Sequence, residues 1–159
     1  MDARPLLARV ARLLDENGLE AVLIGNAAAA LQGAPVTTVD FDFMFRKTPT
    51  NLRKLKALAM ALNAVILRPY YPASGLFRIV RDEDGLQLDF MATVDGVRSL
   101  ASLRSRAKQV TFGADRLLVA SLPDIIKSKR AAGRPRDLAV MEVLEKALHE
   151  EASDEKRET

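Results

Sequence analysis

Apolar residues recur along the chain with two different periods, and the period separates predicted helices from predicted strands. A helix is expected over residues 3–16, because its apolar side chains fall on one helical face (Leu6, Leu7, Val10, Leu13 and Leu14). Residues 20–24 form a short apolar run that is typical of a buried strand. The Ala-rich stretch 27–32 then predicts a short helix that Gly33 ends.

The rest of the chain alternates between the same two patterns. Strands are expected over residues 38–45, 65–67, 76–81, 86–92, 110–112 and 117–120. Helices are expected over residues 48–62, 97–107, 122–132 and 135–149. The strands on either side of residues 82–85 predict a hairpin, and Tyr70-Tyr71-Pro72 predicts a loop. Because the hairpin strands are adjacent in sequence, we expect an α+β fold, a mixed β-sheet flanked by helices.

Composition narrows the possible chemistry. The chain has 159 residues, no Cys and one His, His149. A disulfide framework, a thiolate zinc site and a cysteine nucleophile are excluded, and a catalytic triad built on His149 is not expected. Any metal site must use carboxylates, whose oxygen ligands suit Mg²⁺ or Mn²⁺.

The sequence shows no secretory signal and no apolar run long enough to span a bilayer, so we expect a cytoplasmic protein without a membrane partner. Charge is uneven along the chain. Between residues 98 and 136, ten Lys and Arg side chains are opposed only by Asp115 and Asp124. This segment predicts either a basic face that meets phosphates or a solvated helical surface.

Three acidic residues stand among large apolar ones in predicted strands. Asp40 and Asp42 alternate with Phe41, so both carboxylates lie on one face of the strand, and Asp89 stands between Leu88 and Phe90. If the two strands are neighbours, the carboxylates converge, and divalent cations would relieve their repulsion. The alternative is a half-exposed strand with solvated acids.

A glycine turn follows the first predicted strand. Gly25-Asn26 lies between that strand and the short Ala-rich helix. A glycine at such a place lets backbone N–H groups approach an anion such as a triphosphate. Strand–Gly–helix turns are also routine connections, so the turn alone decides nothing.

Taken together, these motifs resemble the signature of the DNA polymerase β-like nucleotidyltransferases. The pattern is an apolar residue before Gly25-Asn26, a gap of thirteen residues, Asp40-Phe41-Asp42, and the distant acid Asp89 on a strand. The stretch 23–45 is similar to the minimal nucleotidyltransferases and to the abortive-infection and toxin–antitoxin group. So is the ending over residues 122–137, with its Lys followed by Arg-Pro-x-Asp.

The resemblance implies roles for these residues. Asp40, Asp42 and Asp89 would hold the metal ions, and Asp89 would also help to deprotonate the attacking hydroxyl. Gly25 and Asn26 would lie against the β- and γ-phosphates. Relatives carry Gly or Ser at position 26, so Asn26 marks either a tolerated variant or a member with weakened catalysis.

The resemblance also bears on the C-terminal basic motif. Lys129 and Arg134 would bind the nucleotide, and Asp137 matches the acid of the same motif. The alternative for Arg134 and Asp137 is an ion pair that fixes the joint between the last helices.

The function implied is transfer of an NMP from an NTP, ATP or another, to an acceptor hydroxyl with Mg²⁺ or Mn²⁺. The acceptor is a tRNA or other RNA, as for a toxin–antitoxin component, a small hydroxylated molecule of antibiotic type, or a partner protein. A non-catalytic nucleotide- or RNA-binding module is the alternative class. One nucleotidyltransferase-like domain is expected over 1–149, with the catalytic sheet and helices in 1–121, C-terminal helices in 122–149, and a disordered tail over 150–159.

Overall fold

A mixed sheet of seven strands organises residues 3–67 and 75–158, the parts of the chain that the computed structural model describes. The strand order across the sheet is β3-β4-β5-β2-β1-β7-β6. The strands are β1 (Ala21–Ile24), β2 (Phe41–Phe45), β3 (Val65–Leu67), β4 (Leu76–Arg81), β5 (Leu86–Met91), β6 (Lys108–Phe112) and β7 (Asp115–Val119). The predicted mixed sheet and the hairpin β4–β5 are confirmed. The predicted Tyr70-Tyr71-Pro72 loop lies outside the described residues.

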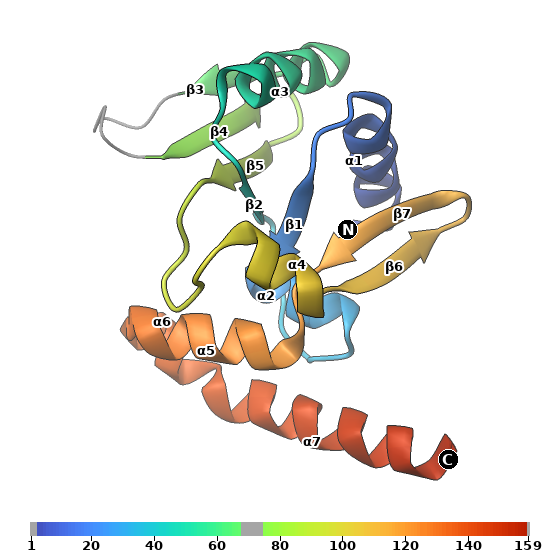
Figure 1. Ribbon diagram of the computed structural model, residues 1–159, viewed down its shortest axis with the longest axis vertical. Coiled ribbons are helices and arrows are strands. Elements are labelled where there is room, and N and C mark those ends of the chain that lie inside the picture. Colours follow the sequence, from blue (N-terminus) through green and yellow to red (C-terminus); the bar gives the residue numbers. More distant parts are fainter. Residues whose placement is uncertain (1–2, 68–74, 159) are drawn as a thin grey trace.

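Helices lie on both sides of the sheet. They are α1 (Arg4–Glu16), α2 (Gly25–Leu31), α3 (Pro49–Ala61), α4 (Leu100–Arg106), α5 (Leu122–Ala132), α6 (Pro135–Ala139) and α7 (Met141–Glu158). Figure 1 shows α1 and α3 together at the top of the view, and α2, α4, α5 and α7 in its lower half. The C-terminal helices α5 and α7 pack against each other.

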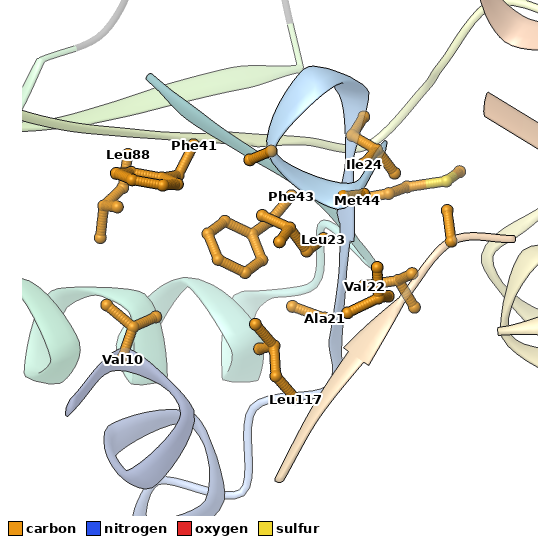
Figure 2. Packing of buried hydrophobic residues seen from close by; sticks show 14 of the residues in the cluster. Val10, Ala21, Val22, Leu23, Ile24, Phe41, Phe43, Met44, Leu88 and Leu117 are labelled. Carbon is orange, nitrogen blue, oxygen red and sulfur yellow. The ribbon is translucent and has the colours of Figure 1, made fainter. Parts of the chain in front are cut away.

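The two faces of the central strands bury different residues. Along β1 and β2, successive side chains point to opposite faces, because the side-chain period of a strand is two. Figure 2 shows Leu23 and Phe43 on the side of Val10 from α1, and Val22 and Met44 on the other. Phe43 stacks on Phe90 of β5, with ring centroids 4.9 Å apart. Phe43 and Phe90, which we call the aromatic layer, cover the face of the sheet on the side of α1 and α3.

Several predicted boundaries shift. The strand predicted over 38–45 begins only at Phe41. The Thr38 hydroxyl accepts a hydrogen bond from the backbone N–H of Asp40 and donates one to the carbonyl of Asp40. This local turn keeps residues 38–40 out of the sheet. The short helix predicted over 27–32 begins earlier, at Gly25. The helix predicted over 97–107 is shorter, because Ser99 caps it and accepts a hydrogen bond from the backbone N–H of Ser102.

The C-terminal predictions need the largest correction. The single helix expected over 135–149 is two helices, α6 and α7, separated at Val140. The tail expected to be disordered over 150–159 continues α7 as far as Glu158. Leu144 and Ala147 anchor this helix in the core, and an ion pair between Glu151 and Lys108 ties its second half to β6. No helix among the described residues is both long and apolar enough to cross a membrane.

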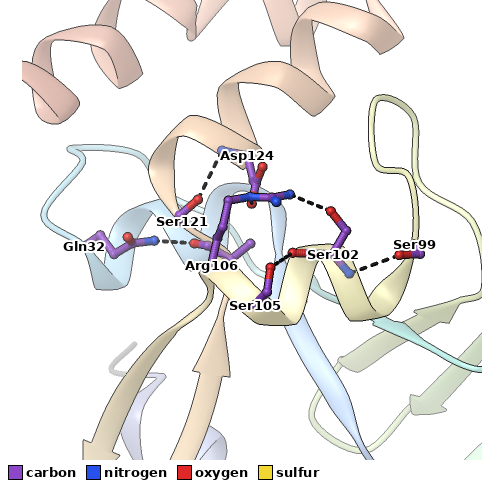
Figure 3. Close-up of polar contacts among 8 residues, drawn as sticks. Gln32, Ser99, Ser102, Ser105, Arg106, Ser121 and Asp124 are labelled. Atoms are coloured by element: carbon purple, nitrogen blue, oxygen red, sulfur yellow. Dashed lines mark hydrogen bonds and ion pairs between the residues drawn. The ribbon is translucent and has the colours of Figure 1, made fainter.

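A polar network sets the position of α5 (Figure 3). Arg106, at the end of α4, donates to the carboxylate of Asp124 at 2.8 Å and to the hydroxyl of Ser102 at 3.0 Å. Ser121 caps α5 by accepting from the backbone N–H of Asp124. Gln32 donates to the carbonyl of Ala120 at 2.7 Å. These bonds join α2, α4 and α5 on the side of the sheet opposite the aromatic layer.

Candidate active site

One row of side chains crosses four neighbouring strands and contains two of the three predicted acids. Asp42 of β2 pairs in register with Ile24 of β1 on one side and with Asp89 of β5 on the other. Asp89 pairs in register with Arg78 of β4. Residues in register on adjacent strands share a face of the sheet, so Arg78, Asp89 and Asp42 lie side by side. This face is opposite the aromatic layer, since Phe43 and Phe90 alternate with the two acids.

Asp42 is a half-buried carboxylate beside other carboxylates. It makes no hydrogen bond or ion pair with any residue that the structure describes. Burial, then the charges of Asp89 and Asp40, raise the pKa of Asp42 from 3.8 to about 6, against the opposing charges of Lys129 and Arg78. Asp40 precedes β2 and is exposed, but its charge reaches Asp42. The charges of both other predicted acids therefore act on Asp42.

Asp89 is more deeply buried than Asp42, and both of its carboxylate oxygens accept hydrogen bonds from neighbouring side chains. Its carboxylate accepts from Arg78 Nε at 2.9 Å (Oδ1) and from Arg78 Nη2 at 3.2 Å (Oδ2). Gln87, two residues earlier on β5, donates to Oδ2 at 3.3 Å. The Asp89 side chain is 9% exposed and that of Arg78 is 42% exposed, so the guanidinium covers a buried acid from the cavity side.

Gly25 and Asn26, which follow β1, line the same cavity as the acids. Gly25 has φ +70°, a conformation that side chains disfavour, and a Cβ there would lie 3.4 Å from Asp42 Oδ2. The glycine thus keeps the space beside Asp42 open. Asn26 Oδ1 is buried and has no hydrogen-bond partner among the described residues. An unpaired buried acceptor is costly unless a ligand or water satisfies it.

Lys129, Arg134 and Asp137 form a cluster at the joint of α5 and α6. Asp137 is 3% exposed, accepts from Arg134 Nε at 2.6 Å, and lies 3.7 Å from Lys129 Nζ. Burial opposes ionisation of Asp137, but the hydrogen bonds and charge of Arg134 outweigh it and lower the pKa of Asp137. Burial lowers the pKa of Lys129. The ion pair expected as the alternative for Arg134 and Asp137 is present, and Lys129 is also close enough to act on Asp42.

All the predicted site residues line one open cavity of about 750 Å³. The cavity lies between the acidic row on the sheet, the turn at Gly25, the segment after β5, and helices α5 and α6. Sequence reasoning missed Arg78, Gln87, Asp95 and Arg136, which also line it. Arg78 was predictable, because counting outward from the 82–85 turn places it opposite Asp89.

The donors present fit a hard divalent cation in part. Among the described residues, no hydrogen-bond donor or ion-pair partner contacts the carboxylates of Asp42 and Asp40, and a bound cation would offset the burial and the repulsion that raise the pKa of Asp42. Within residues 3–67 and 75–158, however, no three His, Cys, Asp or Glu side chains are arranged together as a metal site. Both oxygens of Asp89 already accept hydrogen bonds, from Arg78 and Gln87.

Six of the ten basic residues in the 98–136 segment form ion pairs, most of them with acids that lie outside the segment. Arg104 pairs with Glu20, Arg130 with Glu145, and Lys108 with Glu151, in addition to the pairs of Arg106, Lys129 and Arg134 already described. In the described part of the chain, four basic residues of the segment form no ion pair: Arg98, Arg116, Lys127 and Arg136. The segment therefore offers less free positive charge than its sequence indicates.

Compared by structure, the chain resembles several solved nucleotidyltransferases. ANT(2'')-Ia, in complex with adenylyl-2''-tobramycin, superposes with a TM-score of 0.62 at 16% identity and 98% coverage of both chains. The chain has the nucleotidyltransferase fold. The lincosamide antibiotic adenylyltransferase LnuA, lincomycin-bound, matches with a TM-score of 0.62 at 9% identity, over 91% of this chain and 96% of that one.

A third protein with the nucleotidyltransferase fold is the predicted nucleotidyltransferase TM1012 from Thermotoga maritima. It matches with a TM-score of 0.61 at 17% identity and 92% coverage of both chains. Compared by sequence, no protein-family model and no curated protein matches the chain. The expected nucleotidyltransferase fold is thus confirmed by structure, at identities that show the fold alone.

Proposed function

We propose that the chain is a metal-dependent nucleotidyltransferase that moves an NMP from an NTP to an acceptor hydroxyl. The observation that carries the proposal is the in-register pair Asp42–Asp89, with Asp40 beside it, in a cavity whose rim is Gly25 and Asn26. The pair has a rigid aromatic backing and an open front, which suits a reaction that depends on positioning and electrostatics.

Mg²⁺ or Mn²⁺ would be held by Asp40, Asp42 and one oxygen of Asp89. When bound, the cation would neutralise phosphate charge and lower the pKa of the attacking hydroxyl. Asp89 would help to deprotonate the hydroxyl by holding the cation that lowers the pKa of that hydroxyl, and the proton leaves to solvent. The acceptor oxygen forms a bond to the α-phosphorus as the bond to pyrophosphate breaks. Asn26 and Lys129 border the cavity as donors for the phosphate oxygens, and Arg134 holds Asp137 against Lys129.

For the acceptor, a small hydroxylated molecule is favoured over RNA. Six of the ten basic residues in the 98–136 segment are paired with carboxylates, which removes much of the surface that an RNA backbone would need. Acids also outnumber bases along the cavity (Asp40, Asp42, Asp89, Asp95, Asp124 and Asp137 against Arg78, Lys129, Arg134 and Arg136). Two of the similar structures are antibiotic adenylyltransferases. A toxin–antitoxin role that acts on RNA would require label on tRNA in the experiment below.

The experiment is a label-transfer assay with each of four α-labelled NTPs and Mg²⁺. The acceptors are a panel of hydroxylated antibiotics, bulk tRNA, and the protein itself. We expect label on a small molecule, loss of transfer in Asp42→Asn, and normal transfer in Asp84→Asn, whose carboxylate sits on the exposed hairpin turn. No transfer to any acceptor, with NTP binding intact, would instead support a non-catalytic nucleotide-binding module.

A further inference from the structure

The carboxylate of Asp89 has almost no acceptor capacity left. A carboxylate offers about four lone-pair positions, two on each oxygen. Arg78 Nη2 and Gln87 Nε2 both bond to Oδ2, and Arg78 Nε bonds to Oδ1. One position therefore remains, on Oδ1, while the guanidinium is in place.

The position of Arg78 also keeps other ligands away from the carboxylate of Asp89. Arg78 and Asp89 are direct cross-strand partners, and the two-bond contact fixes the plane of the carboxylate as well as its position. The acid is buried and the guanidinium is half-exposed over it, at the wall of the cavity. A cation that enters from the cavity thus meets Arg78 before it can use both oxygens of Asp89.

We propose that Arg78 is a positioning residue that holds Asp89 side-on, limits it to a single oxygen contact with a metal ion, and competes with metal in the site before nucleotide binds. The proposal rests on the proposed function, because it assigns a purpose to Asp89 in the transfer reaction. It does not require knowledge of the acceptor.

Two opposite effects of removing the guanidinium follow. Without Arg78, both oxygens of Asp89 become available and one positive charge leaves the cavity wall, so a divalent cation binds more tightly. Without the two-bond contact, Asp89 is no longer held in one orientation, so transfer becomes slower. Residues that orient a metal-binding group commonly change affinity or activity by about 10–100-fold when they are lost.

The test has two measurements. One is the affinity for Mn²⁺ without nucleotide, measured from the electron paramagnetic resonance signal of free Mn²⁺. The other is the rate of label transfer. For Arg78→Ala we expect about tenfold tighter Mn²⁺ binding and 10–100-fold slower transfer. Arg78→Gln provides a second uncharged variant with a longer side chain, in case the alanine variant folds poorly. Arg78→Lys keeps the charge but not the two-bond contact, so transfer falls while Mn²⁺ affinity stays near that of wild type.

Arg81 is the matched control. It lies on the same strand, and its Nη2 forms an ion pair with Oδ2 of Asp84 at 2.6 Å. This pair is at the turn of the hairpin, away from Asp42 and Asp89. Arg81→Ala should change neither Mn²⁺ affinity nor the rate of transfer. A purely structural role for the strand arginines would make Arg78→Ala and Arg81→Ala alike.

The results separate the two proposals. If Asp42→Asn abolishes Mn²⁺ binding but folded Arg78→Ala and Arg78→Gln bind Mn²⁺ no more tightly than wild type, the role of Arg78 is overturned and the metal site stands. If Asp42→Asn binds Mn²⁺ as wild type does, the metal site itself is elsewhere and the proposed function fails. Tighter Mn²⁺ binding with slower transfer in both uncharged variants supports the role of Arg78.

Discussion

The two faces of β2 and β5 are made by alternate residues of the same short segments, and they have opposite character. On one face Phe43 and Phe90 stack in a fully buried layer. On the other, Asp42 and Asp89 lie side by side next to an open cavity. The apolar face supplies stability, whereas the acidic face, where burial and neighbouring carboxylates disfavour ionisation of Asp42, is the one that we propose binds a charged ligand. Substitutions on the two faces should therefore have different consequences.

The largest effect is expected on the acidic face. Asp42→Asn keeps the shape of the side chain but removes its charge and its ability to ligate metal, so transfer should fall by about 10³-fold or more. The measurement is the initial rate of label transfer with the acceptor that wild type uses. Asp84→Asn is the control. A rate for Asp42→Asn within tenfold of wild type would show that this carboxylate is not in the reaction.

The largest effect on the aromatic face is a loss of stability. Phe45 is buried and makes edge-to-face contacts with Phe77 and Phe90. Phe45→Ala should lower the free energy of unfolding by about 3–5 kcal/mol, and Phe45→Leu by about 1 kcal/mol. Urea unfolding gives both values. The leucine variant should still transfer label at close to the wild-type rate; abolished transfer in that folded variant would mean that the two faces are not separable.

Substitutions at glycine can separate an effect on stability from an effect on the site. Gly25→Ala places a Cβ at positive φ beside Asp42, whereas Gly113→Ala, at φ +66°, meets no atom within 4 Å. Both variants should lose about 1–2 kcal/mol of stability, because both pay for a left-handed backbone. Only Gly25→Ala should also weaken Mn²⁺ binding and transfer. Equal transfer rates for the two variants would contradict the idea that Gly25 keeps the site open.

The smallest effect is a gain in stability on the acidic face. The raised pKa of Asp42 means that ionisation of this group destabilises the folded protein, and the penalty grows as pH rises from about 4 to about 6. Asp42→Asn removes the penalty, so it should be more stable than wild type by about 1 kcal/mol at pH 7.5 and by nothing at pH 3.5. Urea unfolding at the two pH values checks this. Equal stability at pH 7.5 would show that Asp42 is not destabilised by its neighbours.

Sequence patterns predicted the parts of the molecule that depend on local periodicity. The alternation around Asp42 and around Asp89 placed both acids opposite the phenylalanines, and their adjacency followed once β2 and β5 were neighbours. The pairing of β2 with β5 itself is a long-range contact, which no local pattern specifies. The resemblance to nucleotidyltransferases, rather than periodicity, brought the two strands together in advance.

Other features depended on tertiary partners. The helical state of residues 150–158 follows from an anchored α7 and from the contact of Glu151 with Lys108, two segments far apart in sequence. In the same way, Glu20, Glu145 and Glu151 neutralise part of the charge of a segment whose own sequence is strongly basic. Charge counted along a chain overestimates charge on a surface when acids from distant elements pack beside it.

Joint binding of an NTP and a divalent cation by Asp42 and its neighbours can be tested without knowing the acceptor. The measurement is the dissociation constant of an NTP by equilibrium dialysis, with and without Mn²⁺, for wild type and Asp42→Asn. If Asp42 and its neighbours bind both ligands, Mn²⁺ should tighten NTP binding to wild type by at least about tenfold and have little effect on the variant. NTP binding that is independent of Mn²⁺, or equally enhanced by it in both proteins, would rule out a cation site at Asp42.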